Sequence, residues 1–312
     1  MKKAIVLGAT GGMGSALTLE LAGRGISVTA FARNKEKLQK LFGNSKVIKI
    51  HEGDVFDKES LSEACAGHEV IFHAINIPYP EWAVNQPVLI ENILHATKEN
   101  GAKLAIVDNI YAYGMITDKK VAETDRKAPH TKKGKLRLKL EEQVKSSGVE
   151  YCIAHFPDFY GPHAGNSLLN YTLNYVVRNK RAGYMGDHSI EREFIYTPDG
   201  AKAMVNIASE TSAYGQNWNV PGSRTIAGSE VIEIVRANTE YTKKVGTITK
   251  PMIRLLGWVN PMMREYVEMY YLNKTPVVLS GEKYKAHFGE LPSTPYEQGI
   301  PATLDSLRSF NA

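Results

Sequence analysis

Hydrophobic residues in the first half of the chain are arranged with two alternating periods. Short apolar runs of strand length, rich in valine and isoleucine, recur from residue 3 to about residue 155. Because both faces of these segments are apolar, they are typical of strands covered by helices on both sides. The predicted strands are residues 4–7, 28–32, 47–50, 70–75, 104–107 and 151–154.

Segments with helical periodicity lie between these strands and end near glycine, which favours the end of a helix. The predicted helices are residues 13–22, 57–64, 88–99 and 136–146, ending near Gly23, Gly67, Gly101 and Gly148. Strict alternation of strand and helix predicts parallel strands joined by right-handed crossovers. We therefore predict an α/β fold with a doubly wound parallel sheet of the Rossmann type.

Beyond residue 160 the alternation weakens, and tyrosine, methionine and proline become frequent. We interpret this part as a smaller C-terminal substrate region, with the chain crossing between the two parts more than once. The predicted dinucleotide-binding domain comprises residues 1–158 and about 192–221, and the smaller region comprises about 159–191 and 222–312. A chain of 312 residues suits such a pair of closely packed units.

The net charge of +5 comes from one segment of the chain. Seven cations and no anion lie between residues 126 and 139, namely Arg126, Lys127, Lys132, Lys133, Lys135, Arg137 and Lys139. The segment has no aromatic residue for stacking on bases, so we do not expect nucleic-acid binding. A solvated loop and helix face explains the charge at least as well as contact with a phosphate or cofactor.

Other features exclude several classes of protein. With only Cys65 and Cys152, a disulfide framework is impossible, which favours a reducing cytoplasm. No apolar run approaches the roughly 20 residues of a membrane helix, so we expect no membrane partner. None of the nine histidines forms a His-x-x-x-His pair, so we predict no metal. We expect a small-molecule substrate, and a homodimer is compatible with the sequence.

The first strand leads directly into a glycine-rich loop that opens the first helix. Glycine permits the tight turn, the close approach of a pyrophosphate and the packing of helix on sheet. The N-terminus of the helix then favours the anion. We predict that a dinucleotide binds here. The predicted loop contacts are Gly8, Thr10, Gly11, Gly12, Met13 and Gly14.

The end of the second strand indicates which dinucleotide is bound. NAD-selective sites usually carry an acidic residue here, which binds the ribose hydroxyls. This chain instead has Arg33 and Lys35. A guanidinium suits the 2′-phosphate of NADP(H), whereas a carboxylate would repel it. We therefore predict NADP(H) rather than NAD; the alternative is that both cations merely begin a solvated helix.

Three further segments carry a family resemblance: Gly53-Asp54-Val55, Tyr113-Gly114 after the fifth strand, and Pro157-Asp158-Phe159-Tyr160-Gly161-Pro162. With the glycine loop, they make the chain resemble the extended, epimerase/dehydratase-like branch of the short-chain dehydrogenase/reductase superfamily. The resemblance implies that Asp54 binds the adenine and that the segment from Pro157 lies beside the nicotinamide. The further cofactor contacts expected are Asp54, Val55, His73, Ala74, Ile75, Pro157 and Phe159.

The catalytic positions of that family are substituted in this chain. In the family, a Ser or Thr polarises the substrate oxygen, and a Tyr-x-x-x-Lys motif supplies the proton. Alignment on the neighbouring motifs assigns the Ser position to Asn109 and the Tyr and Lys positions to Lys133 and Arg137. The one Tyr-x-x-x-Lys of the chain, Tyr270 to Lys274, lies far along the substrate region, and we interpret it as chance.

Three hypotheses for the site remain open from the sequence. In the first, Lys133 replaces the tyrosine as proton donor while Asn109 stabilises the developing oxyanion. In the second, Tyr111 or Tyr113 acts as the acid. The first two describe an NADP(H)-binding oxidoreductase or epimerase-like enzyme acting on a carbonyl or hydroxyl of a small or sugar-like substrate. In the third, the protein is an inactive NADP(H)-binding regulator or redox sensor, similar to the NmrA-like relatives.

Overall fold

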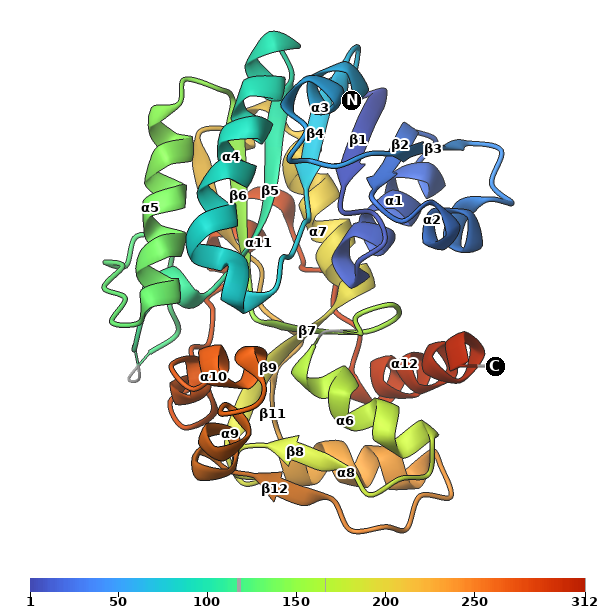
Figure 1. The fold of residues 1–312 in the computed structure, drawn as a ribbon, viewed down its shortest axis with the longest axis vertical. Coiled ribbons are helices and arrows are strands. Elements are labelled where there is room, and N and C mark those ends of the chain that lie inside the picture. The colour runs from blue at the N-terminus through green and yellow to red at the C-terminus, as the bar shows by residue number, and fades with distance from the viewer. Residues whose placement is uncertain (117–118, 166, 312) are drawn as a thin grey trace.

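The large sheet of the protein is seen in a computed structural model that describes residues 1–116, 119–165 and 167–311. In this part of the chain, seven strands form one parallel sheet in the order β10-β6-β5-β4-β1-β2-β3 (Figure 1). The strands are β1 (Lys3–Leu7), β2 (Ser27–Ala32), β3 (Ile48–Glu52), β4 (Val70–His73), β5 (Lys103–Asn109), β6 (Tyr151–Phe156) and β10 (Gln216–Asn219). The strand order reverses between β1 and β4, where α/β proteins bind ligands.

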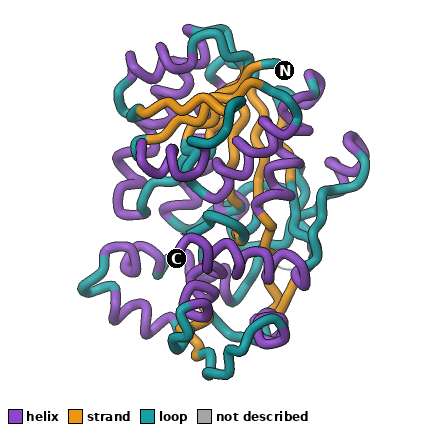
Figure 2. Tube along the Cα trace, turned by 90° about the vertical axis from the view of Figure 1, so that its right-hand side faces the viewer, coloured by secondary structure: helices purple, strands orange, loops and turns teal. Residues whose placement is uncertain are grey.

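Helices cover both faces of this sheet, as the side view in Figure 2 shows. One face carries α1 (Gly12–Gly23), α2 (Lys35–Phe42), α7 (Thr197–Ser209) and α11 (Glu282–Phe288). The other carries α3 (Lys58–Cys65), α4 (Trp82–Glu99) and α5 (Lys132–Ser146). The short 3-10 helices η1 (Tyr79–Glu81), η2 (Tyr111–Tyr113) and η3 (Thr211–Ala213) lie in the connections. The predicted doubly wound Rossmann-type fold is confirmed.

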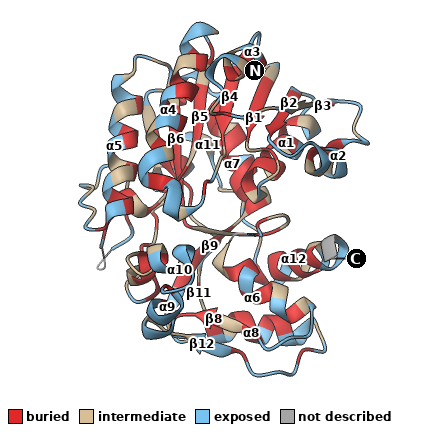
Figure 3. Cartoon of the chain, in the orientation of Figure 1, coloured by how far each residue is buried: buried red, intermediate tan, exposed pale blue. Residues whose placement is uncertain are grey.

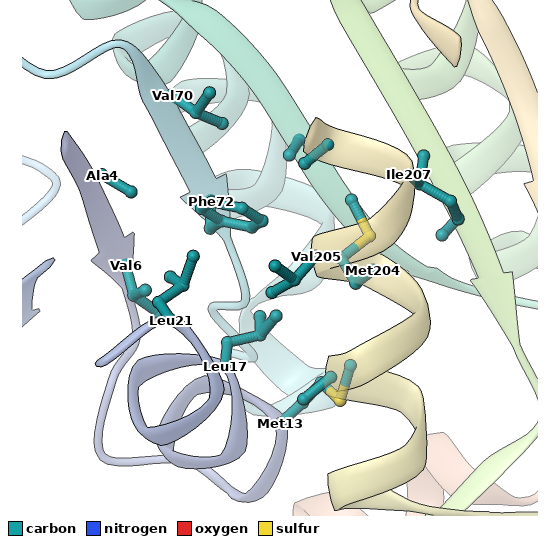
Figure 4. Close-up of a cluster of buried hydrophobic side chains, with 14 of the residues drawn as sticks. Ala4, Val6, Met13, Leu17, Leu21, Val70, Phe72, Met204, Val205 and Ile207 are labelled. Carbon is teal, nitrogen blue, oxygen red and sulfur yellow. The ribbon is translucent and has the colours of Figure 1, made fainter. Parts of the chain in front are cut away.

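The core on the first face lies between α1 and α7 (Figure 4). Leu17 and Leu21 of α1 are fully buried with Val6 and Phe72 of the sheet. Met13 packs so closely on α7 that a Cβ added to Gly200 would lie 3.2 Å from its methyl carbon. A segment after residue 190 therefore completes the packing of the first helix.

The second part of the molecule contains two small sheets. Strands β7 (Asp158–Tyr160), β9 (Glu191–Tyr196) and β11 (Thr225–Ala227) form one sheet, and β8 (Gly183–Met185) and β12 (Gly246–Ile248) form the other. The surrounding helices are α6 (Leu168–Val177), α8 (Gly228–Ala237), α9 (Lys250–Leu256), α10 (Pro261–Tyr266), η4 (Met269–Asn273) and α12 (Tyr296–Asn311). The chain crosses between the two parts repeatedly, since α7, β10 and α11 return to the large sheet (Figure 1).

Burial in Figure 3 follows the predicted strands closely, but two helices begin earlier than their periodicity predicts. Helix α4 begins at Trp82 and continues through Pro87, its sixth residue, which removes one N–H that would donate to the Ala83 carbonyl. Helix α5 begins at Lys132, because the Thr131 hydroxyl accepts the Gly134 N–H at 3.0 Å and caps it. No described helix combines the length and the apolar character needed to cross a membrane.

Candidate functional site

The glycine loop lies at the carboxyl end of β1, next to the point where the strand order reverses. Gly8 has a φ of +86°, and a Cβ there would lie 2.8 Å from the carbonyl oxygen of Ala74. Helix α1 begins after Gly11 with no side-chain cap and no acidic residue in its first turn. The amides of this turn are therefore available to an anion, and the loop fits a diphosphate.

A second segment lies against this loop from the other part of the molecule. A Cβ added to Gly12 would lie 2.7 Å from the Cα of Ala164, so the backbones are in close contact. Ala164 follows the segment that begins at Pro157. Pro157 is buried, and Phe159 is half-buried with its ring packed on Phe156. The structure thus brings the predicted nicotinamide segment and the predicted phosphate loop to one place.

The residues predicted for the adenosine end lie along the ends of β2 and β3. Arg33 is exposed, whereas Lys35 lies 3.8 Å from Glu52 in an exposed ion pair. Asp54 is exposed and accepts the Phe56 N–H at 3.1 Å, and the carbonyl of buried Val55 accepts a hydrogen bond from Asn92 at 3.0 Å. Arg33, Lys35 and Asp54 thus place exposed polar side chains just after the carboxyl ends of β2 and β3.

Positive charge collects at this edge of the sheet. Burial lowers the pKa of Lys37 on α2. Burial, followed by the charges of Lys37 and Lys40, also lowers the pKa of His163, which places this histidine near both lysines. Arg33, Lys37 and Lys40 create a positive field at the rim of the site, which favours an anionic ligand.

The predicted contacts after β4 are held by backbone hydrogen bonds. The Ala74 N–H donates to the Leu7 carbonyl at 3.0 Å, which presses Ala74 against Gly8. The Ile75 N–H donates to Nδ1 of His73 at 3.4 Å. Burial, assisted by the nearby charge of Arg137, lowers the pKa of His73 to about 3, so this histidine is neutral at pH 7. His73 therefore acts here as a buried polar support.

Arg137, at the position of the family lysine, is paired inside the protein. Its Nε and Nη2 donate to Oδ1 of Asp108 at 2.8 and 2.5 Å, and both side chains are buried. Asn109, the neighbour of Asp108 at the end of β5, accepts the Tyr111 N–H through its Oδ1 at 3.0 Å. Arg137 therefore binds Asp108 at the end of β5, and Asn109 stabilises the turn that follows this strand.

Lys133, at the position of the family tyrosine, links the two parts of the molecule. Its Nζ donates to Glu265 at 2.6 Å and to Glu268 at 2.8 Å. Glu268 also accepts the Lys132 N–H at 2.7 Å, so it satisfies the N-terminus of α5 from outside the helix. Two carboxylates from the C-terminal part thus reach the catalytic position that the sequence assigns to Lys133.

Tyr111 lies beside a second tyrosine that the sequence analysis did not identify. The hydroxyl groups of Tyr111 and Tyr79 are 2.5 Å apart, and burial raises the pKa of both phenols. The ring of Tyr79 lies under Nζ of Lys133, 5.1 Å from its centroid. Both phenols therefore stay neutral at pH 7 and lie close to the predicted acid positions.

Tyr113, the other tyrosine proposed as acid, is fully buried. Its hydroxyl donates to Oδ1 of Asn219 on β10 at 2.7 Å, and burial raises its pKa. Its hydroxyl is thus used within the core, which leaves the hypothesis of a tyrosine acid with Tyr111.

The basic segment between residues 126 and 139 is not a solvated face throughout, and this part of our interpretation is wrong. Lys127, Lys133 and Arg137 are ion-paired and largely buried. Lys127 donates to Glu141 and to Nε2 of His155, the latter at 2.8 Å. These ion pairs cannot be predicted from the sequence, because the acidic partners lie on other elements of the fold.

Lys127 lies at the centre of a cluster of buried polar groups. Asp108, Glu141 and His155 present ligand-type atoms within 4.8 Å of one another. Asn217 donates to Glu141 at 2.7 Å, and the ammonium of Lys127 contacts both Glu141 and His155. Because lysine supplies the positive charge in this cluster, its chemistry fits a structural ion-pair network better than a metal centre.

Sequence reasoning missed several side chains around the site, which lie on β9, on or just after α10 and in the 3-10 helix η1. Arg192 donates to Asp158 at 2.6 Å on the side of the C-terminal part. Asp158 lies within the segment predicted beside the nicotinamide, so its place could have been found. The other missed residues, Tyr79, Arg192, Glu265 and Glu268, lie outside any motif, and no sequence signal marks them.

Comparisons with known proteins agree with this geometry. The model of the NAD dependent epimerase/dehydratase family matches residues 4–220. The uncharacterized oxidoreductase C736.13 of Schizosaccharomyces pombe is 28% identical over 204 residues, which are 61% of this chain and 58% of that protein. Oxidoreductase AgnL4 of Paecilomyces divaricatus is 41% identical over 81 residues, which are 23% of this chain and 31% of that protein. The matches span less than two thirds of either relative.

Solved structures share the fold over nearly the whole chain. UDP-glucuronic acid 4-epimerase of Bacillus cereus, in complex with NAD, has a TM-score of 0.82 at 16% identity and covers 99% of this chain and 100% of its own. The dTDP-glucose 4,6-dehydratase of Bacillus anthracis, in complex with NAD, has a TM-score of 0.80 at 16% identity, covering 99% and 97%. The family match includes well over half of the chain, confirms the resemblance found in the sequence, and shows that this chain belongs to the NAD dependent epimerase/dehydratase family.

Proposed function

We propose that this protein is an NADP(H)-dependent oxidoreductase that acts on a carbonyl or hydroxyl carbon of a small or sugar-like substrate. The observation that carries the proposal is the glycine loop with Arg33, rather than a carboxylate, at the end of β2. A guanidinium there suits a 2′-phosphate. The bacterial epimerase and dehydratase structures hold NAD, which supports a nicotinamide dinucleotide. The preference for NADP(H) rests on this chain's own residues.

Different residues around the glycine loop would bind different parts of this coenzyme. The amides at the start of α1 would hold the diphosphate, and Arg33 with the neighbouring cations would hold the 2′-phosphate. Asp54 and Val55 would contact the adenine, and Ala74, Ile75, Pro157 and Phe159 would line the nicotinamide side. A bound nicotinamide would supply or accept a hydride.

Side chains of the protein would donate the proton to the substrate oxygen. In the pair formed by Tyr79 and Tyr111, one hydroxyl donates to the other, so the hydrogen of the second remains free for a ligand. Because burial keeps both phenols protonated, the pair suits donation to a carbonyl that is being reduced. Lys133 is the alternative donor, although two carboxylates already accept from its ammonium.

A second candidate function is coenzyme binding without turnover. The observation in its favour is that Arg137 is paired with Asp108 and that Lys133 is paired with two glutamates. Both family positions are thereby engaged in ion pairs within the protein. This role requires the same dinucleotide site, and the two functions differ only in whether hydride transfer follows.

We expect Arg33→Ala to weaken NADPH binding by about tenfold or more, because a charge-assisted contact with the 2′-phosphate is lost. NADH binding should change by less than about threefold. Dissociation constants from coenzyme fluorescence measure both effects, and Lys46→Ala, which removes an exposed cation beyond α2, is the matched control. Tighter binding of NADH than of NADPH by the unmodified protein would refute the assignment.

We expect Tyr111→Phe to lower kcat by about 100-fold, because general-acid assistance at the substrate oxygen is lost, while NADPH affinity is retained. The measurement follows NADPH absorbance with a panel of aldehydes, ketones and nucleotide sugars. Tyr175→Phe, which changes an exposed tyrosine of α6, is the control. Full turnover in the Tyr111 variant, with loss in Lys133→Met, would transfer the role to Lys133. Intact NADPH binding with no turnover on any substrate would favour the second candidate function.

A further inference from the structure

Helices α9 and α10 form a hairpin, residues 250–266, that exposes an unusual number of apolar side chains. Trp258 is 84% exposed and Val259 is 85% exposed at the turn between the helices. The other two tryptophans of the chain, Trp82 and Trp218, are buried. The exposed apolar residues of the hairpin are Met252, Leu255, Leu256, Trp258, Val259 and Met262. Exposed apolar side chains gathered on one short segment in this way indicate an interaction site.

The hairpin is held in place, so these side chains are presented outward by a defined structure. Ile253 is fully buried in the core of the C-terminal part. A Cβ added to Gly257 would lie 3.0 Å from the Cα of Arg264, which shows how closely the two helices approach. The side chain of Asn260 accepts the Met263 N–H at 3.3 Å and caps α10. Near the end of α10, Glu265 accepts a hydrogen bond from Lys133.

The charges around the turn of the hairpin have one sign. Lys250, Arg254 and Arg264 are cations, of which Arg254 and Arg264 are exposed, and the one carboxylate of the hairpin, Glu265 near the end of α10, is paired with Lys133. No Asp or Glu occurs between residues 250 and 264. The apolar turn is therefore bordered by cations alone, which is complementary to an anionic surface.

We propose that this hairpin docks on the surface of an anionic lipid bilayer, with Trp258 and Val259 entering the headgroup region and the three cations contacting lipid phosphates. The amphipathic indole ring is favoured at this depth of a bilayer, and basic residues beside an apolar face strengthen binding to anionic lipids. Such docking lies on the membrane surface and needs no spanning helix.

The same charges disfavour a second copy of this chain as the occupant. A two-fold interface places the same patch on both subunits, so the cations of one hairpin would face those of the other. An anionic bilayer meets the apolar and the basic residues at once. The docked face also lies beside the site, because Glu265 of α10 itself pairs with Lys133.

Vesicle binding tests the proposal through the one exposed tryptophan. Vesicles of phosphatidylcholine with phosphatidylglycerol should shift the protein's tryptophan emission to shorter wavelength and should sediment with the protein. Added salt should weaken both effects. The double variant Trp258→Ser/Val259→Ser should lower the partition coefficient by at least about tenfold. Val84→Ser, which removes a 71% exposed apolar side chain of α4, is the matched control and should bind normally.

Several outcomes would overturn the proposal, and none depends on catalytic turnover. They are failure to sediment with anionic vesicles at low salt, equal binding to pure phosphatidylcholine, and undiminished binding of the double variant. A dimer in analytical ultracentrifugation that the double variant converts to monomer would instead assign the hairpin to contact between copies. Thermal melting of the double variant, expected to match that of the unmodified protein, ensures that a loss of binding reports the surface.

Discussion

Replacing Gly14 with alanine is expected to destabilise the protein by about 3 kcal/mol and to abolish coenzyme binding. A Cβ at this position would lie 2.1 Å from the carbonyl oxygen of Gly8, closer than any real contact. That carbonyl accepts the Gly11 N–H at 3.0 Å, so relieving the clash must also distort the loop. Calorimetry should show a fall in Tm of about 6 °C or more, and coenzyme titration should show no binding.

Gly23 provides the matched control for this substitution. It is the last residue of the same helix, and a Cβ there would meet nothing within 4 Å. Gly23→Ala should therefore leave Tm unchanged or slightly raised and coenzyme binding intact. Equal behaviour of the two variants would show that the close packing at Gly14 does not limit stability or binding.

Replacing Glu141 with glutamine should destabilise the protein by about 3–5 kcal/mol, because the buried ammonium of Lys127 would lose its counter-charge. Both side chains lie in the polar cluster behind the end of β5, and Glu141 is buried. Urea unfolding measures the loss. Glu142→Gln removes the same charge from the exposed neighbouring position and should change the free energy of unfolding by less than about 0.5 kcal/mol.

A double variant tests whether the cost comes from an unpaired buried charge or from the other contacts of Glu141. Lys127→Met together with Glu141→Met removes both charges, so it should recover much of the stability that the single variant loses. A cost for Glu141→Gln no larger than that for Glu142→Gln would contradict the assigned role of the buried pair.

The same cluster makes the protein sensitive to acid. Although burial alone would raise the pKa of Glu141, the charges of His155 and Lys127 and the hydrogen bonds from Lys127 and Lys145 lower it to about 2. Its stabilisation is therefore complete above about pH 4.5 and lost as the pH falls towards 2. Burial lowers the pKa of His155 to about 4, so stability also falls between about pH 6.5 and 4, where only the unfolded state takes up that proton.

The sheet could be predicted from the sequence because its strands are short apolar runs between helices that end at glycine. The helix starts were harder to predict. Residues 82–87 of α4 include Pro87, which normally interrupts a helical pattern, yet the helix continues through it with the loss of one backbone hydrogen bond. The early start of α5 depends on the Thr131 cap and on Glu268, which is far away in the sequence. A hydrophobic period contains no information about either contact.

The two halves of the site were predictable to different degrees. The glycine loop follows from local backbone geometry, so the sequence alone located it. The acid–base side depends on contacts between remote segments, as in the pairs that Lys133 forms with Glu265 and Glu268. The cation at residue 133 was visible in the sequence, but its partners were not, because no local pattern connects residues more than 130 positions apart.

The packing of α7 on α1 determines the order in which the chain can become stable during synthesis. Leu17 and Leu21 need the helix that begins at Thr197 to complete their core, and the edge strand β10 follows only at Gln216. A ribosome that has finished the first six strands has therefore released a sheet with one apolar layer incomplete. Such a nascent chain exposes apolar surface until translation has reached the helix that begins at Thr197. We therefore expect chaperones to bind it during synthesis.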